Sequence, residues 1–201
     1  MKKISLKFGV LLFLFNFWTS SSASDIPRPE ETVSEFQHTL TKVLKEKHYE
    51  AKLSLLLPSV SKLFAVDTIA RISFGTRSWK LLNDNERKVF QTLTTNLIAS
   101  TYAARFKEFK DQRFEINESI SLRKNRHAVK TQLFSGEAAV SLEYHLQNKD
   151  SAWQIYDIVA NGVSDLNLKR SAYGKTLAEI GFSGLVDDIK KEIKKNSEKS
   201  F

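Results

Sequence analysis

The sequence predicts an α+β protein in which helices come first, a block of strands follows, and a helix ends the chain. Changes in the spacing of apolar residues carry this prediction. The spacing is three to four residues from about residue 30 to Phe109, two residues from Phe114 to Val159, and three to four again beyond Gly162. Because the longer spacing is that of a helix and the shorter that of a strand, helices and strands occupy separate parts of the chain, as in α+β domains.

Prolines, glycines and capping residues set the expected limits of the helices. Residues 30–47 carry an apolar stripe behind a pair of prolines, which predicts an amphipathic helix. Pro58 interrupts the next apolar stretch, so a second helix is expected to begin at Ser59 and to end at Gly75. A third helix is expected to begin at Asn83, because a glutamate stands three residues later as in a capping box.

Four segments of alternating apolar and polar residues predict four strands joined by short polar turns. Short turns favour antiparallel neighbours, so the strands are expected to form a curved antiparallel meander packed against the helices. A chain of this length needs a sizeable core, and spacing does not distinguish a filled core from one that opens into a pocket. The residues expected on the inner face of the sheet are Phe114, Ile116, Val129, Leu133, Val140, Leu142, Tyr144, Leu146, Trp153, Ile155 and Val159.

The first 23 residues have the three-part layout of a cleavable secretory signal. Basic residues come first, an apolar run over residues 10–18 follows, and Ser21 and Ala23 supply the small positions of a cleavage site. A membrane anchor is the alternative, but the run is short for a hydrocarbon layer of about 30 Å. We therefore expect cleavage after Ala23, an exported protein, and one domain over residues 24–201.

The charge of the chain is moderately basic and concentrated at the C-terminal end. Cleavage would remove three lysines and no acid, which lowers the formal net charge from +8 to +5. Lysines cluster between Lys190 and Lys199, in a final helix or tail that either attracts anionic headgroups in transient contact with a membrane surface or solvates the helix end. No nucleic-acid-binding motif is visible, so nucleic acid is not an expected partner.

Motifs for catalysis and metal binding are missing from the sequence. It has no cysteine, its four histidines are not at metal-ligand spacing, and it has neither a glycine-rich phosphate loop nor a GxSxG element. We expect no metal, no cofactor and no enzymatic activity. Asp157 needs separate consideration, since its register places it among inward apolar residues. A carboxylate there either acts as a general base or pairs with an arginine such as Arg170.

Short motifs in a fixed order, spread from about residue 64 to residue 186, resemble one protein family. They are Asp67–Arg71, Phe74-Gly75 with Trp79, Asn85–Arg87 with Phe90, Thr101-Tyr102, Arg170-Ser171 and Gly181–Leu185. The most specific block is Trp153–Ile158, which continues without a gap into Asn161–Ser164. This pattern resembles the toluene-tolerance or MlaC family of periplasmic phospholipid-binding proteins. The segment from Tyr102 to Phe106, together with Phe114-Glu115, is similar to its hopanoid-associated HpnM branch.

The resemblance implies a carrier that holds lipid acyl chains in a hydrophobic pocket between the sheet and the helices. It also implies a periplasmic protein that exchanges phospholipid with an outer-membrane lipoprotein complex and an inner-membrane ABC transporter complex. Arg170 and Asp157 would lie near the headgroup or have a structural role. Departures from the family pattern at Ala65, Lys169 and Tyr173 affect contacts with lipid or partner rather than the fold. The residues expected to contact lipid are Phe64, Phe74, Leu93, Leu97, Ile116, Val129, Leu133, Leu142, Tyr144 and Ile155.

Other interpretations remain open from the sequence. A polycyclic lipid such as a hopanoid would keep the carrier mechanism and change the cargo. An enzyme would use Asp157 and Tyr144 for acid–base chemistry on an apolar substrate. An adaptor protein of the cell envelope would have a filled core and no ligand.

Overall fold

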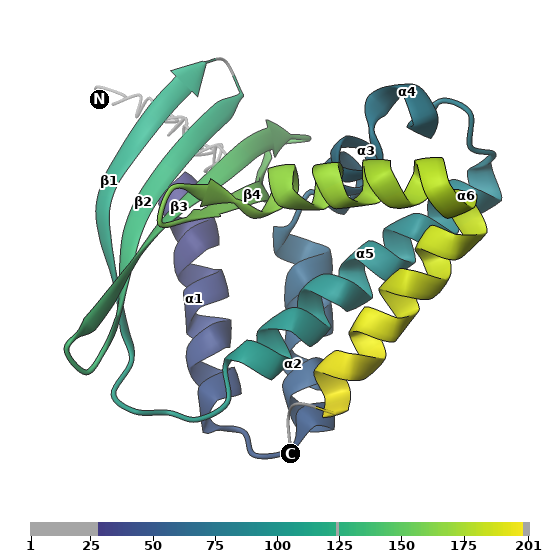
Figure 1. Cartoon of the computed structure of the whole chain (residues 1–201). Coiled ribbons are helices and arrows are strands. Elements are labelled where there is room, and N and C mark those ends of the chain that lie inside the picture. The colour runs from purple at the N-terminus through teal and green to yellow at the C-terminus, as the bar shows by residue number, and fades with distance from the viewer. Residues whose placement is uncertain (1–27, 124, 199–201) are drawn as a thin grey trace, which may run out of the picture.

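The computed structural model describes residues 28–123 and 125–198. The expected signal segment, residues 1–23, lies outside the described residues. The α+β class is confirmed, because helices precede and follow an antiparallel sheet (Figure 1). The helices are α1 (Pro29–Lys45), α2 (Tyr49–Leu63), α3 (Val66–Phe74), α4 (Thr76–Trp79), α5 (Asp84–Arg105) and α6 (Asp165–Glu198).

In the described part of the chain the sheet is a meander of five antiparallel strands in sequence order. The four predicted strands are present, but the prediction missed the fifth, which has two residues and pairs with Val159 and Ala160. Two residues show no detectable alternation, so the sequence pattern gives no signal for such a strand. The strands are β1 (Arg113–Arg123), β2 (Arg126–Ser135), β3 (Ala138–Lys149), β4 (Ala152–Ala160) and β5 (Val163–Ser164).

The curved sheet forms one side of the molecule and the helices gather on the other (Figure 1). Helix α1 packs along the sheet and contacts β1, β2 and β4. Helix α2 packs between α1 and α5, and the second half of α6 runs beside α5. Strand β1 lies at the outer edge and is the least covered of the long strands, because most of the helices that contact the sheet do so at β4.

Two hydrophobic clusters make up the core of the described residues. The first cluster joins α1 and α2 to the inner face of the sheet, with Phe36 and Tyr144 among its most buried side chains. The second cluster joins α3, α5 and α6 around Phe90 and Leu185. Helix α5 contributes to both clusters, yet they remain separate groups of contacts. The core is therefore divided into two packed centres, and we call the boundary between the two clusters the seam.

The break in the first helical region lies at Phe64-Ala65, which corrects the predicted helix start at Ser59. Pro58 lies inside α2, where it has no N–H to donate to the carbonyl of Ser54. Both residues are exposed, so solvent reaches that carbonyl and the helix continues. The chain leaves the helix at Ala65 because the N–H of Ala65 donates to the carbonyl of Ile155, with N and O 2.9 Å apart.

A β-bulge in β4 changes which residues face the helices. Adjacent residues of β3 pair with Ile155 and Asp157, so Tyr156 is an extra residue in β4. Beyond Tyr156 the alternation shifts by one position, and Ile158 rather than Val159 shares the inner face with β3 residues of the first cluster. The prediction that Asp157 and Val159 follow the inward register of Ile155 is therefore wrong.

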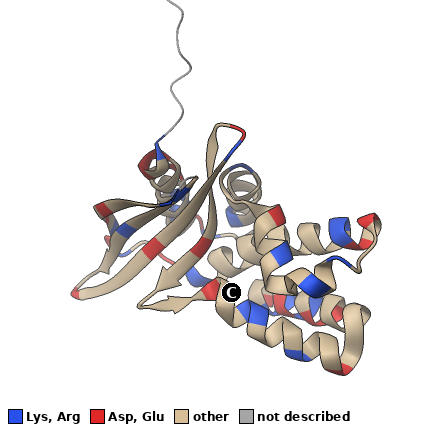
Figure 2. Cartoon of the chain, turned by 90° about the horizontal axis from the view of Figure 1, so that it is seen from above, with Lys and Arg blue, Asp and Glu red and all other residues tan. Residues whose placement is uncertain are grey.

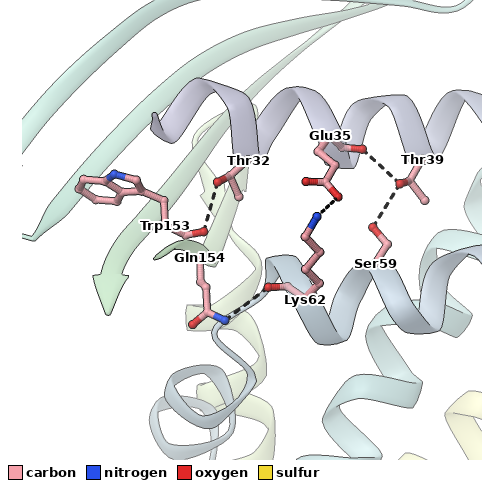
Figure 3. A network of polar contacts seen from close by, with 7 residues as sticks. All are labelled: Thr32, Glu35, Thr39, Ser59, Lys62, Trp153 and Gln154. Carbon is pink, nitrogen blue, oxygen red and sulfur yellow. Dashed lines mark hydrogen bonds and ion pairs between the residues drawn. The ribbon is translucent and has the colours of Figure 1, made fainter. Parts of the chain in front are cut away.

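Polar contacts fix α1 and α2 to the start of β4 (Figure 3). The hydroxyl of Thr32 donates to the carbonyl of Trp153 at 3.2 Å, and the amide of Gln154 donates to the carbonyl of Lys62 at 3.4 Å. Between the helices, the Lys62 ammonium lies 2.5 Å from the carboxylate of Glu35. These contacts hold the two helices against one end of the sheet.

Lys52 is a buried cation that caps the end of α5. The residue is 3 % exposed, and its Nζ donates to the carbonyls of Phe106 at 2.7 Å and Lys107 at 2.9 Å. The last carbonyls of a helix otherwise lack partners. Lys52→Met is therefore expected to lower the free energy of unfolding by about 2 to 3 kcal/mol, measured by urea denaturation.

The matched control for this prediction is Lys62→Met. It removes an exposed ion pair only, so it should cost less than about 1 kcal/mol. An equal loss of stability in the two variants would contradict the capping role of Lys52.

Candidate functional site

An open cavity lies at the seam between the two hydrophobic clusters. Its volume of about 400 Å³ is within the range of roughly 300 to 1,000 Å³ that is typical of ligand pockets. Phe64 and Tyr144 line it from the first cluster, and Leu97 and Tyr173 line it from the second. The cavity is therefore the place where two packed cores meet without closing on each other.

Aromatic rings close the cavity at the end that faces α1 and the sheet. Phe36 packs edge-on against Phe64 and Tyr102, with ring centroids 4.8 and 5.0 Å apart. Its ring also lies 6.5 Å from that of Tyr144. Burial raises the pKa of the Tyr102 and Tyr144 hydroxyls above the usual tyrosine value, so both stay neutral near pH 7. These rings present an uncharged wall to a ligand.

Two polar residues on the helical wall have their hydrogen bonds satisfied within their own helices. The hydroxyl of Ser73 donates to the carbonyl of Ala70 at 3.2 Å, and the hydroxyl of Thr94 donates to that of Phe90 at 2.8 Å. Neither hydroxyl therefore needs a polar partner from a ligand. Together with neighbours such as Leu97, they form a wall suited to an apolar ligand.

Charged and exposed apolar side chains surround the mouth of the cavity. Arg105 at the end of α5 and Lys169 on α6 are cations among the lining residues. The Lys169 ammonium lies 3.7 Å from the carboxylate of Asp165. Val163 and Leu168, which also line the cavity, are 51 % and 58 % exposed. Asp157 and Asp165 also line the cavity, so its charged lining carries both signs and can contact the polar end of a ligand whose body is apolar.

Asp157 caps the start of α6. Its Oδ2 accepts a hydrogen bond from the Ser164 hydroxyl at 2.6 Å, and its Oδ1 accepts one from the backbone N–H of Leu166 at 3.1 Å. A carboxylate in this place also interacts favourably with the positive end of the helix dipole. Arg170, which the sequence suggested as the partner of Asp157, is exposed and lies outside the cavity lining. The partner of Asp157 is thus the start of a helix and not an arginine.

The lysines in the second half of α6 stand among acidic residues. The Lys190 ammonium lies 3.9 Å from the carboxylate of Asp187, and that of Lys191 lies 3.3 Å from Asp188. Figure 2 shows acidic and basic residues interspersed over the helices. This mixture favours the interpretation of a solvated helix end over that of a one-sign surface for anionic headgroups. Lys199 lies outside the described residues.

The family model described as MlaC protein matches residues 30–191, which is most of the chain. The chain belongs to the MlaC family. This finding confirms the resemblance seen in the sequence motifs. No curated protein matches the chain significantly.

Among solved structures, this MlaC-family chain is similar to a phospholipid-binding protein from Ralstonia solanacearum in complex with a phospholipid. The TM-score is 0.76 at 15 % sequence identity, over 85 % of this chain and 99 % of the other. At this level of identity, the likeness shows a shared fold.

Half of the residues expected to contact lipid line the cavity. They are Phe64, Leu97, Leu133, Leu142 and Tyr144, from the α2–α3 junction, α5, β2 and β3. Leu97 lies on a helical stripe, and Leu133, Leu142 and Tyr144 lie on the inner face of the sheet, as expected, whereas Phe64 lies at the break between α2 and α3. The contact of these residues with lipid stays a prediction.

The other five expected contacts lie outside the cavity lining. Val129 and Ile155 are fully buried in the first cluster, and Phe74 and Leu93 belong to the second. Ile116 has the expected inward register on β1 but is 40 % exposed, because β1 is the edge strand and the helices leave this part of it uncovered. The spacing of apolar residues predicts that these side chains point inward. It does not predict how far each one lies from the seam.

The sequence did not predict several residues that line the cavity. They lie on segments whose place in the fold cannot be deduced from the spacing of apolar residues. Ile158 and Ala160 lie beyond the bulge in β4, which leaves no signal in the sequence pattern. Leu166 and Tyr173 come from the first half of α6, which the sequence did not place over the sheet. Leu40 was visible as part of a helical stripe, but a stripe does not tell which turn of the helix reaches a cavity.

Within residues 28–123 and 125–198, no cluster of three or more His, Cys, Asp or Glu side chains is placed to hold a metal ion. No helix in these ranges combines the length and apolar character needed to cross a bilayer.

A pair of matched substitutions tests the placement of the cavity. Leu133 and Ile116 both have inward register on the β1–β2 hairpin, but only Leu133 lines the cavity. Leu133→Asn is expected to weaken binding of an apolar fluorescent dye by about fivefold or more, because the amide loses its hydrogen bonds to water when the dye enters. Ile116→Asn should leave the dissociation constant unchanged in the same fluorescence titration. Equal weakening in both variants would show that the cavity is not where the dye binds.

Proposed function

We propose that the protein is a lipid carrier that holds acyl chains in the cavity between the sheet and the helices. The observation that carries this proposal is the cavity itself, which is largely apolar within, open at its mouth, and walled by two separate cores. Membership of the MlaC family supports the proposal, as does a fold shared with a phospholipid-binding protein.

A large solvation cost explains why a carrier needs such a cavity. A phospholipid with about 30 chain methylenes costs on the order of 24 kcal/mol to hold in water, at ~0.8 kcal/mol for each methylene. A few exposed apolar residues at the surface cannot offset this cost, whereas a deep pocket removes much of the chain surface from water. Binding also has to be reversible, which requires the open mouth or a partner that widens it.

The lipid headgroup is expected at the mouth of the cavity. Arg105 and Lys169 offer cations to a phosphate there, and charge-assisted hydrogen bonds of this kind are among the stronger polar contacts. Lys169 stands where many family members have an aromatic residue, so this chain brings an additional cation to the mouth. Arg170 is the next residue along α6 and is exposed, which leaves it available to a headgroup or to a partner.

The carrier is expected to work in the periplasm, between the two membranes of the cell envelope. The signal-like N-terminus and the family support an exported protein. In this proposal it exchanges phospholipid with an outer-membrane lipoprotein complex and an inner-membrane ABC transporter complex. The direction of transport depends on the energised partner, because a carrier alone only equilibrates its cargo.

The similarity of the segment Tyr102–Phe106 to the hopanoid-associated branch favours a polycyclic lipid as the second candidate cargo. Tyr102 and Phe106 both line the cavity, so this segment lies where cargo specificity would be set. An acid–base enzyme is less well supported, because both carboxylate oxygens of Asp157 accept hydrogen bonds from the start of α6.

A charge placed in the cavity wall tests the carrier function. Leu142 lines the cavity, whereas its neighbour Ser141 is exposed and has the opposite register on β3. Leu142→Arg is expected to reduce the lipid that copurifies with the protein about tenfold, because an unpaired charge among acyl chains is strongly unfavourable. Mass spectrometry of solvent extracts measures this amount and distinguishes phospholipid from hopanoid. Ser141→Arg is the control and should retain the wild-type amount; normal lipid in a folded Leu142→Arg variant would refute the proposed site.

A further inference from the structure

Helix α6 consists of two segments with different surroundings. They meet at Gly181, whose φ of 70° and ψ of −170° fall in a region that only glycine adopts readily. The second segment, residues 182–198, buries Leu185, Val186 and Ile189 in the second cluster. The first segment, residues 165–180, contributes Leu166 and Tyr173 to the cavity wall. We call residues 165–180 the strap, because they cross the cavity between β5 and the kink.

The strap has few buried side chains to hold it in place. Leu166 and Tyr173 are its buried residues, and Leu168 and Ile180 are more than half exposed. Segments with little buried apolar surface open at a lower free energy than the core does. The contacts at the two ends of the strap therefore matter for keeping the cavity covered.

The start of the strap follows β5, which pairs with β4, and the carboxylate of Asp157 adds side-chain contacts at the same place. Ser164 accepts a hydrogen bond from the backbone N–H of Asn167 at 3.0 Å, which is the usual arrangement of a helix cap, and donates its own hydroxyl to Asp157. Asp157 also accepts the N–H of Leu166 directly. Since Asp157 belongs to β4 and lines the cavity, its carboxylate joins the first turn of the strap to the sheet wall of the cavity.

We propose that Asp157 is a positioning residue for lipid retention. Its carboxylate latches the first turn of the strap beside β5, and loss of the latch allows this turn to open so that the strap moves away from the cavity between β5 and Gly181 and the lipid leaves. This inference rests on the proposed carrier function. Asp157 itself need not touch the lipid, because it acts through the position of Leu166 and Tyr173.

The rate of lipid release tests the latch. Full-length mature protein, residues 24–201, is loaded with a phosphatidylethanolamine that carries a fluorescent label on one acyl chain. It is then mixed with an excess of unlabelled phosphatidylethanolamine and phosphatidylglycerol vesicles. Asp157→Ala removes both acceptors and is expected to speed release by about fivefold or more, the size of effect expected from a lost helix cap. Asp157→Asn keeps an oxygen for the Leu166 N–H and an amide that donates to Ser164, so it should release lipid at nearly the wild-type rate.

Two further variants separate the latch from general destabilisation. Asp187→Ala removes an exposed aspartate on the far side of Gly181 and should leave the release rate unchanged. Ser164→Ala removes the hydroxyl but keeps the Asp157–Leu166 hydrogen bond, so a smaller acceleration is expected. If Asp157→Ala does not fold, the Ser164→Ala rate decides the question, and a wild-type rate there overturns the latch.

Hydrogen exchange shows whether the effect is local. In Asp157→Ala, amide exchange is expected to rise in residues 164–180 and to stay unchanged in residues 182–198. Release at the wild-type rate from folded Asp157→Ala, or a rise in exchange spread over both segments, would overturn the latch alone. A wild-type protein that retains no labelled lipid at all would overturn the carrier function together with it.

Discussion

The division of the hydrophobic core into two clusters is the constraint on which the rest of this structure depends. A domain of this size normally closes its apolar surfaces around one centre, because every uncovered side chain costs free energy. Here the first cluster is fixed between α1, α2 and the sheet, and the second between α3, α5 and α6. Each cluster has its own fully buried side chains, so the seam between the clusters can stay open without unfolding the protein.

The contacts that hold the two clusters apart are specific. Aromatic rings around Phe36 stiffen one end of the seam, and those around Phe90 stiffen the other, where the ring of Phe74 packs against it with centroids 5.0 Å apart. Lys52 of α2 ties this helix to the chain at the end of α5. In the proposed latch, the strap of α6 is the part of the wall that moves, because few of its side chains are buried. Rigid walls with one movable side suit a protein that binds a large apolar ligand and later gives it up.

The sequence predicts the layers of the fold well and the cavity only in part. Helical stripes and strand alternation place Leu97, Leu142 and Tyr144 correctly, because period determines which way a side chain points. Period does not determine whether a neighbouring element covers that side chain, which is why Ile116 is exposed and Val129 is sealed in the core. The bulge at Tyr156 and the break at Ala65 both depend on pairing between distant segments. No local sequence pattern predicts such contacts. The family motifs supplied the expectation of a pocket that hydrophobic spacing alone could not give.

Native mass spectrometry of residues 24–201, purified from a bacterial periplasm without detergent, tests the lipid-carrier proposal most directly. A folded protein with an open seam is expected to carry added mass that fragments to a phospholipid or a polycyclic lipid. The identity of that lipid would also fix the cargo class. A homogeneous ligand-free mass that persists after incubation with lipid vesicles would contradict the proposal, and would mean that the seam serves some purpose other than holding acyl chains.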